Sequence, residues 1–211
     1  MDMGNVMKWI TASALCLSLA AGLSGIASAQ EAQTLISGNV THGGFGGPEI
    51  KFGTVAGSPG VWVGGRGGWI INATPNHAIS IGGGGYGLVS DHLAGIQPAG
   101  SENLYALSGY GGFILEYTNR SYRLAHITVS SLIGAGAVLL RDKEYETVNE
   151  DENDPFFVFE PSLSIELNVT HFFRIAAGAG YRFTNGISDF GYSDSDFSAF
   201  TGTLTFKFGK F

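Results

Sequence analysis

The chain is poor in cysteine, in charge and in long hydrophobic runs. It has one cysteine, Cys16, among 211 residues, and 14% of its residues are charged, whereas soluble domains typically carry about 25%. After residue 29, no stretch approaches the roughly 18 consecutive apolar residues that a spanning helix needs. Disulfides, zinc–thiolate sites and a spanning helix are therefore excluded there, and the shortage of charge predicts an apolar environment.

The beginning of the chain has the organisation of a secretory signal. Lys8 precedes an apolar run, and small residues follow in Ala27-Ser28-Ala29, which predicts cleavage with Ala27 and Ala29 as the recognised positions. We predict a cleaved signal peptide over 1–29, which contains Cys16, and an N-terminal periplasmic segment over 30–43. The alternative is an uncleaved anchor, and translation starts at either Met1 or Met7.

The net charge restricts the partners. The formal charge is −7, and it remains −7 after cleavage because Asp2 and Lys8 cancel. A negative chain does not suit a nucleic-acid partner, since phosphate backbones need clustered Lys and Arg. We therefore expect no nucleic-acid binding.

Alternation of apolar and polar residues, the pattern of strands, recurs along the rest of the chain. It is clearest near the middle of the second half, where Glu160, Ser162, Ser164 and Glu166 alternate with Phe159, Leu163 and Ile165. Eight such segments are predicted: 44–55, 60–73, 77–90, 103–118, 121–141, 156–169, 171–185 and 196–210.

The connections between these segments alternate in length. Tight turns are expected at Thr74-Pro75-Asn76, Asn119-Arg120 and Thr170, and long polar loops at 91–102, 142–155 and 186–195. Short turns on the periplasmic side and long loops outside are typical of outer-membrane barrels, which must close because lipid offers no partner to an unpaired strand edge. The fold class is therefore all-β: an eight-stranded antiparallel up-and-down transmembrane β-barrel over 44–211.

A glycine motif tests the alternative of nucleotide binding. Gly82, Gly84 and Gly87 form G-x-G-x-x-G, but no helix is predicted after them to hold a phosphate. Glycines instead recur within nearly every strand, where a small barrel needs small inward residues beside large ones. We assign the motif to a strand interior.

Aromatic residues gather near the predicted strand ends, as interfacial girdles do. We expect this role for Trp62, Trp69, Tyr105, Tyr117, Phe172 and Phe183.

The chain resembles the small outer-membrane barrels of the OmpA and OmpX type. The resemblance rests on Ala27-Ser28-Ala29, the eight segments, GAGYRF at 178–183 and the final LTFKFGKF at 204–211. It implies an assembly signal at Phe206, Phe208 and Phe211 that the outer-membrane assembly machinery reads. Phe206 and Phe208 are out of phase with Phe211, so either a bulge lies near Gly209 or the signal is a variant.

With the apolar phase facing lipid, nine charged residues face the lumen. This lumen charge network comprises Glu49, Lys51, Arg66, Glu116, Glu160, Glu166, Arg174, Arg182 and Lys207. Four acids and five bases indicate paired charges that fill the interior, because an unpaired buried charge is costly. The alternative is a gate whose ion pairs exchange partners and admit small ions.

An enzymatic role is the second alternative, because some outer-membrane barrels modify lipid A. His42, His77, His126 and His171 are expected at or near the periplasmic rim, away from the outer leaflet. Ser90-Asp91-His92 lies on the outer side, but strand neighbours point to opposite faces and form no relay by themselves. We predict no enzyme activity, no catalytic residues, no metal site and no cofactor.

The loop 142–154 is strongly acidic. It carries seven carboxylates (Asp142, Glu144, Glu146, Glu150, Asp151, Glu152 and Asp154) against Lys143 alone. The spacing fits no EF-hand, so we expect a solvated loop, with divalent-cation binding as the alternative.

We therefore predict a monomeric integral outer-membrane protein with a structural, adhesion or surface-interaction role. Its expected partners are outer-membrane lipid and lipopolysaccharide, the assembly machinery and an extracellular ligand at the loops. A lipocalin-like carrier would need polar outward faces instead.

Overall fold

The computed structural model describes residues 40–97, 103–143 and 153–211. The predicted signal peptide with Ala27 and Ala29, residues 30–39 and the acidic residues 144–152 lie outside the described residues. Within them, no helix is long and apolar enough to cross a membrane.

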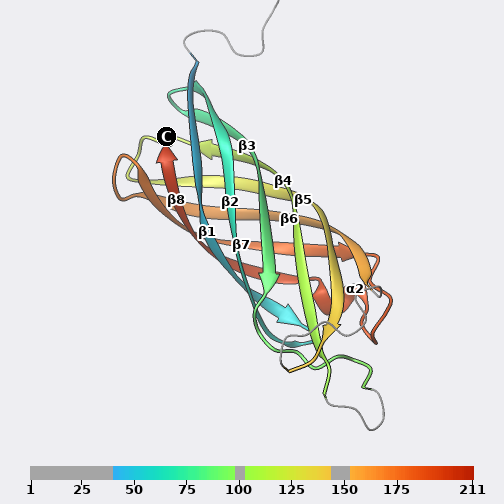
Figure 1. Ribbon diagram of the computed structural model, residues 1–211. Helices are drawn as coiled ribbons and strands as arrows, with labels where there is room; N and C mark the ends of the chain where they lie inside the picture. The colour runs from blue at the N-terminus through green and yellow to red at the C-terminus, as the bar shows by residue number, and fades with distance from the viewer. Residues whose placement is uncertain (1–39, 98–102, 144–152) are drawn as a thin grey trace, which may run out of the picture. The chain divides into compact units, whose positions relative to one another are not determined.

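Eight antiparallel strands form a closed barrel in sequence order, which confirms the predicted fold class (Figure 1). The strands are β1 (Thr41–Val55), β2 (Ser58–Thr74), β3 (His77–Leu88), β4 (Tyr105–Asn119), β5 (Ala125–Arg141), β6 (Asp154–Asn168), β7 (Phe173–Asn185) and β8 (Ala199–Lys210). β1 pairs with β8 to close the barrel, with one interruption at Gly47 and Pro48, where proline has no N–H to donate.

The polarity of the barrel is inverted relative to a soluble protein. In β6, Leu163 is 55% exposed and Ile165 60%, whereas the neighbouring Glu166 is 1% exposed. Apolar residues on the outside and charged residues inside are stable only if hydrocarbon surrounds the strands. The strands therefore form a membrane barrel, and the lipocalin-like alternative is wrong.

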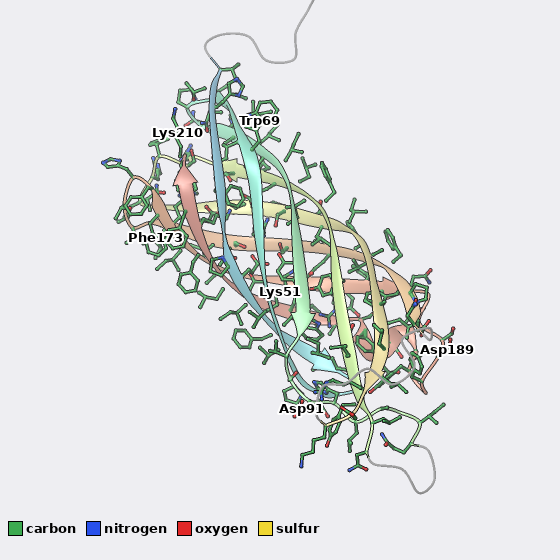
Figure 2. The ribbon with its side chains drawn as sticks, in the orientation of Figure 1. Lys51, Trp69, Asp91, Phe173, Asp189 and Lys210 are labelled. Atoms are coloured by element: carbon green, nitrogen blue, oxygen red, sulfur yellow. The ribbon has the colours of Figure 1, made fainter. Side chains whose placement is uncertain are left out.

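The two ends of the barrel differ in their connections. Residues 75–76, 120–124 and 169–172 join strands at the short-turn end, and 56–57, 89–104, 142–153 and 186–198 join them at the long-loop end. In Figure 2, Asp91 and Asp189 lie at the long-loop end, opposite Trp69, Phe173 and Lys210. This alternation matches the prediction, which assigns the short-turn end to the periplasm.

Three strands begin three or more residues from the predicted position, and the other boundaries differ by at most two. β1 begins at Thr41, and β5 begins at Ala125 because residues 120–124 form a longer turn with Arg120 at φ 54°. β8 begins at Ala199 because α2 (Asp194–Phe197) precedes it. The Asp196 carboxylate accepts the Ser193 backbone N–H at 2.8 Å, which starts this single helical turn.

The glycine motif lies within β3, as predicted. Its inward Gly82 faces Gly68 of β2 so closely that a Cβ would overlap the Gly67 and Gly68 backbone. The described loop after Leu88 forms no helix, so the motif offers no phosphate site.

Five of the six residues predicted for the girdles face outward, and the prediction is wrong for Trp62. Trp69, Tyr117, Phe172 and Phe183 are exposed on the barrel surface, and Tyr105 is partly exposed. Trp62 is 1% exposed and lies inside, because it shares the inward phase of β2 with Arg66.

Candidate functional site

The nine charged residues of the lumen charge network all lie inside the barrel. Glu49 and Lys51 come from β1, Arg66 from β2, Glu116 from β4, Glu160 and Glu166 from β6, Arg174 and Arg182 from β7, and Lys207 from β8. Every side chain among them that forms an ion pair is no more than 9% exposed. Their arrangement forms three groups along the barrel.

Glu160 is the centre of the first group. The Lys51 ammonium lies 2.6 Å from Glu160 Oε2, and the hydroxyls of Tyr110 and Thr201 each donate to the same carboxylate at 2.9 Å. Lys51 also lies 3.8 Å from the centroid of the Tyr86 ring. Several hydrogen bonds thus compensate for the burial of this pair.

Arg66 is the centre of the second group. Its Nη2 lies 2.8 Å from Glu116 and its Nη1 3.3 Å from Glu49. Glu49 also accepts hydrogen bonds from the hydroxyls of Tyr86, at 2.7 Å, and Thr205. One guanidinium therefore bridges β1 and β4 across the lumen.

Glu166 is the centre of the third group, nearest the short-turn end. Lys207 forms ion pairs with both Glu166 and Glu116, the latter at 2.7 Å. His126 Nε2 lies 3.3 Å from Glu166, and Arg174 Nη1 lies 3.7 Å from it. The His126 Nδ1 is 3.1 Å from the Arg123 carbonyl, so this nitrogen donates.

Arg182 departs from the expected pairing. No carboxylate of the described residues lies within ion-pair distance of it. Its Nε donates to the Phe197 carbonyl at 2.8 Å and its Nη2 to the Thr54 carbonyl at 3.4 Å. Its guanidinium carbon lies 3.8 Å from the Trp62 ring centroid, so Arg182 connects α2 to the barrel wall.

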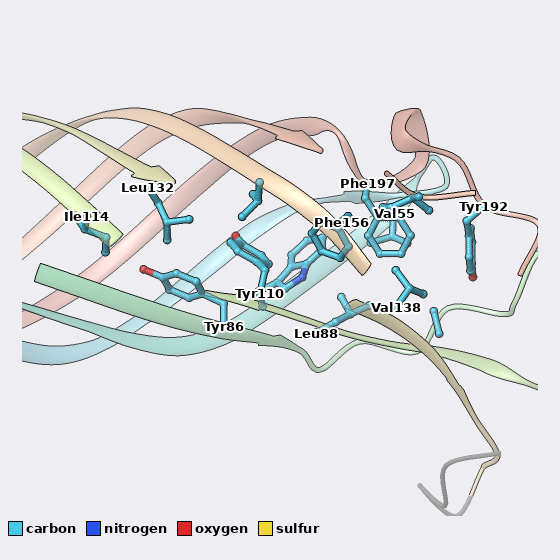
Figure 3. Close-up of a cluster of buried hydrophobic side chains, with 14 residues drawn as sticks. Val55, Tyr86, Leu88, Tyr110, Ile114, Leu132, Val138, Phe156, Tyr192 and Phe197 are labelled. Atoms are coloured by element: carbon cyan, nitrogen blue, oxygen red, sulfur yellow. The ribbon is translucent and has the colours of Figure 1, made fainter. Parts of the chain in front are cut away.

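A hydrophobic cluster fills the lumen next to the long loops (Figure 3). Phe197, Tyr192 and Ile187 come from the loop after β7 and pack with strand residues that include Trp62 and Phe156. We call these 14 residues the hydrophobic plug: Val55, Trp62, Tyr86, Leu88, Ala106, Tyr110, Ile114, Leu132, Val138, Phe156, Val158, Ile187, Tyr192 and Phe197. Burial beside Asp196 raises the pKa of Tyr192 to about 12.

Little space remains between these groups. One cavity bordered by Glu49, Arg66 and Glu160 has a volume of about 10 Å³, and another bordered by Glu116, Arg174 and Lys207 also has about 10 Å³. Each has room for about one water. Neither of these two cavities is large enough to form an aqueous passage.

Sequence reasoning did not include five polar members of the network or the hydrophobic plug. His126, Tyr86, Tyr110, Thr201 and Thr205 all share the inward phase of their strands, so alternation alone could have included them. The loop residues of the plug lack strand periodicity, so only the three-dimensional structure reveals them.

The sequence Ser90-Asp91-His92 forms a partial constellation. Ser90 Oγ lies 2.9 Å from His92 Nε2 but also accepts the Val61 backbone N–H at 3.0 Å. Asp91 pairs with Arg141 instead of orienting the imidazole. Burial lowers the pKa of His92, although Asp91 acts in the opposite direction. The three residues do not form a relay.

His42, His77 and the described end of the acidic loop provide no reactive arrangement either. His77 Nδ1 lies 2.6 Å from the Tyr117 hydroxyl at the short-turn end, and His42 stacks on Trp69. Asp154 accepts the Ser188 and Asp189 backbone N–H groups, each at 2.8 Å. Among the described residues, no three His, Cys, Asp or Glu side chains gather as a metal would require.

The predicted assembly-signal residues point in two directions. Phe208 faces outward and stacks on Phe173 with centroids 4.7 Å apart, and Phe206 shares that outward phase. Phe211 lies on the inward side, with its ring centroid 3.8 Å from the Arg174 guanidinium carbon. β8 keeps one register with β1 up to Lys210, so the first of the two alternatives, a bulge near Gly209, is wrong, and Phe206 and Phe208 are out of phase with Phe211.

By sequence, the chain matches no family model and no curated protein. By structure, it is similar to Ail, the attachment invasion locus protein of Yersinia pestis, solved in complex with the heparin analogue sucrose octasulfate. The TM-score is 0.50 at 10% identity, over 80% of this chain and 95% of Ail. This similarity shows the fold of a small outer-membrane barrel.

Two further solved barrels are similar. Neisserial surface protein A has a TM-score of 0.47 at 8% identity, covering 82% of this chain and 99% of that protein. OprG from Pseudomonas aeruginosa has a TM-score of 0.40 at 8% identity, covering 82% of this chain and 97% of that protein.

Proposed function

We propose that the protein is a non-conducting outer-membrane barrel that acts through its long-loop end, as a surface-interaction or adhesion protein. The filled interior is the observation that supports this proposal most. Ion pairs and the hydrophobic plug fill the lumen, and the two cavities between them have room for about one water each. This filling opposes a channel and leaves the loops as the surface that meets a partner.

The loops are preorganised for binding. The Tyr192 hydroxyl donates to the Leu93 carbonyl at 2.7 Å, and the Ile96 N–H donates to the Phe190 carbonyl at 3.1 Å. These bonds join the loop after β3 to the loop after β7. The Arg182 side chain also holds the second loop, because its Nε donates to the Phe197 carbonyl. A loop surface that is already ordered loses less entropy when it binds a partner.

The charge of the loops supports a basic partner. Asp189 is exposed at the long-loop end, and the loop 142–153 carries six carboxylates against Lys143. The structure of Ail contains a heparin analogue, which is a polyanion. These acidic loops would repel such a ligand, so we propose a basic protein or peptide surface for this chain.

The test compares two immobilised forms of the refolded barrel. Wild type is expected to bind poly-lysine and to release it as salt rises, because screening weakens exposed charge pairs. A variant with Asp142→Asn, Glu144→Gln and Glu146→Gln is expected to bind at least about fivefold more weakly. The control is His77→Gln at the opposite end, which leaves binding unchanged.

Two results would contradict this proposal. One is equal binding of poly-lysine by the wild type and by the loop variant. The other is preferential binding of heparin, which would give this chain a ligand like that of Ail in spite of its charge.

A further inference from the structure

A cleft at the short-turn end has no role in the proposed function. Its volume is about 640 Å³, and its lining residues are Ser121, Tyr122, Asn168, Val169, Thr170, His171, Arg174 and Phe211. A second space of about 310 Å³ shares Ser121, Tyr122, Arg174 and Phe211 with it. Both volumes match those of small-molecule sites.

The walls of the cleft are held in place. The side-chain amide of Asn168, the last residue of β6, donates to the Ser121 carbonyl at 2.9 Å and to the Arg123 carbonyl at 2.7 Å. The Asn168 backbone N–H donates to the Leu124 carbonyl at 2.9 Å. The two turns that face each other across the cleft are therefore locked together and preformed.

Arg174 lines the cleft, and its guanidinium makes few close polar contacts. Its side chain is 9% exposed, and its Nε has no hydrogen-bond partner. Its remaining polar contacts are long: 3.3 Å to the Ser121 carbonyl, 3.5 Å to His126 Nε2 and 3.7 Å to Glu166. A buried guanidinium with unsatisfied donors is costly unless another acceptor reaches it.

The carboxylates near Arg174 lie closer to other cations than to Arg174. Glu166, the carboxylate nearest Arg174, already pairs with Lys207 and lies 3.3 Å from His126. Glu116, the next carboxylate, pairs with Arg66 and Lys207. Both nearby carboxylates are thus paired with other cations, and the Arg174 Nε is left open to a further acceptor.

We propose that this cleft binds a small organic carboxylate that carries an aromatic or branched apolar group. The carboxylate would accept hydrogen bonds from Arg174, whose planar fork suits two oxygens. Tyr122, Val169 and Phe211 provide the apolar wall for the rest of the molecule. The ring of Phe211, 3.8 Å from the Arg174 guanidinium carbon, must turn aside to uncover the guanidinium.

The experiment is an NMR titration of the folded ¹⁵N-labelled barrel in nanodiscs with benzoate, and in parallel with uncharged benzyl alcohol. Benzoate is expected to shift the Arg174 Nε–H signal saturably and to bind about tenfold more tightly than benzyl alcohol, because only benzoate offers a charged acceptor. Arg174→Gln is expected to weaken benzoate binding about tenfold. Lys210→Gln, which removes an exposed cation that does not line the cleft, is expected to change nothing.

Three results would overturn the proposal: no saturable shift, equal affinity for the two probes, or equal benzoate affinity in Arg174→Gln and wild type. Mobility in cold SDS shows whether each variant is a closed barrel. If Arg174→Gln does not fold, Arg174→Lys decides, because it keeps the charge but loses the bidentate fork and is expected to bind benzoate several-fold more weakly. Unchanged affinity in that variant also contradicts the proposal.

Discussion

Arg66 is the residue on which the centre of the lumen charge network depends. It is the guanidinium that contacts both Glu49 and Glu116, and each carboxylate keeps one other cation when Arg66 is removed. We expect Arg66→Met to lower the free energy of unfolding by about 3 kcal/mol, the lower part of the range for broken buried pairs. Urea unfolding in micelles measures this change.

Two further variants provide a control and a rescue for Arg66→Met. Lys210→Met removes an exposed cation and is expected to change stability by less than about 0.5 kcal/mol. Adding Glu116→Gln to Arg66→Met is expected to recover part of the loss, because one carboxylate no longer needs a cation. If Arg66→Met unfolds at the same urea concentration as wild type, the network does not stabilise the barrel.

Whether each strand side chain points into or out of the barrel was predictable, because side chains along a strand alternate with a period of two. That rule placed all nine charged residues inside the barrel. It does not say which acid pairs with which base, so the lack of a described carboxylate beside Arg182 could not be foreseen. Trp62 was misassigned because position near a strand end was given more weight than its phase.

At the scale of the element, β3 tests the role of glycine. A Cβ on the inward Gly82 would overlap the backbone of Gly67 and Gly68, whereas a Cβ on the outward Gly85 would meet its nearest atom at 3.9 Å. We expect Gly82→Ala to cost about 1–3 kcal/mol through overpacking and Gly85→Ala to cost almost nothing. The temperature at which the cold-SDS form converts to the unfolded form measures both.

The two glycine variants form a matched pair, because they differ only in the face of one strand. Backbone entropy alone would make both variants slightly more stable, so equal losses in both would mean that the close approach of β2 and β3 does not explain these glycines. A loss confined to Gly85→Ala would reverse the assignment of inward and outward faces.

Elements with strong periodicity were predicted well, and elements defined by local hydrogen bonds were not. The eight strands follow from alternation, but α2 has only four residues. Its signal is Ser193 followed three residues later by Asp196, which is common by chance. The longer turn before β5 depends on a positive φ at Arg120, which no residue pattern there indicates.

At the scale of the whole barrel, the filled lumen predicts that the protein conducts no ions. We expect the refolded wild-type protein to give no stable conductance steps in planar bilayers, because the hydrophobic plug and the three ionic groups fill the lumen, with cavities of about 10 Å³ between them. We expect no conductance from Arg66→Ala or Glu116→Ala either. Each substitution opens space within the lumen charge network but leaves the hydrophobic plug intact.

Steady conductance in the wild type, altered by either substitution, would support the gated channel instead. Transient openings in a variant that lacks the Phe197 ring would identify the plug as the barrier to ions. The sequence favoured a lumen filled by charged side chains. It could not show that the loop after β7 also fills the lumen, because that depends on how the loop folds back into the barrel.

The pairing of β1 with β8 also constrains when the protein can fold. Glu49 and Thr205 are hydrogen-bonded partners separated by 156 positions in sequence. Contacts this distant form slowly, because most of the chain's freedom is lost before they are made. The barrel cannot close while β8 is still being synthesised or exported. Closure is therefore a late event. Until it occurs, the apolar strands of unclosed chains can associate with one another, so aggregation is most frequent before this step.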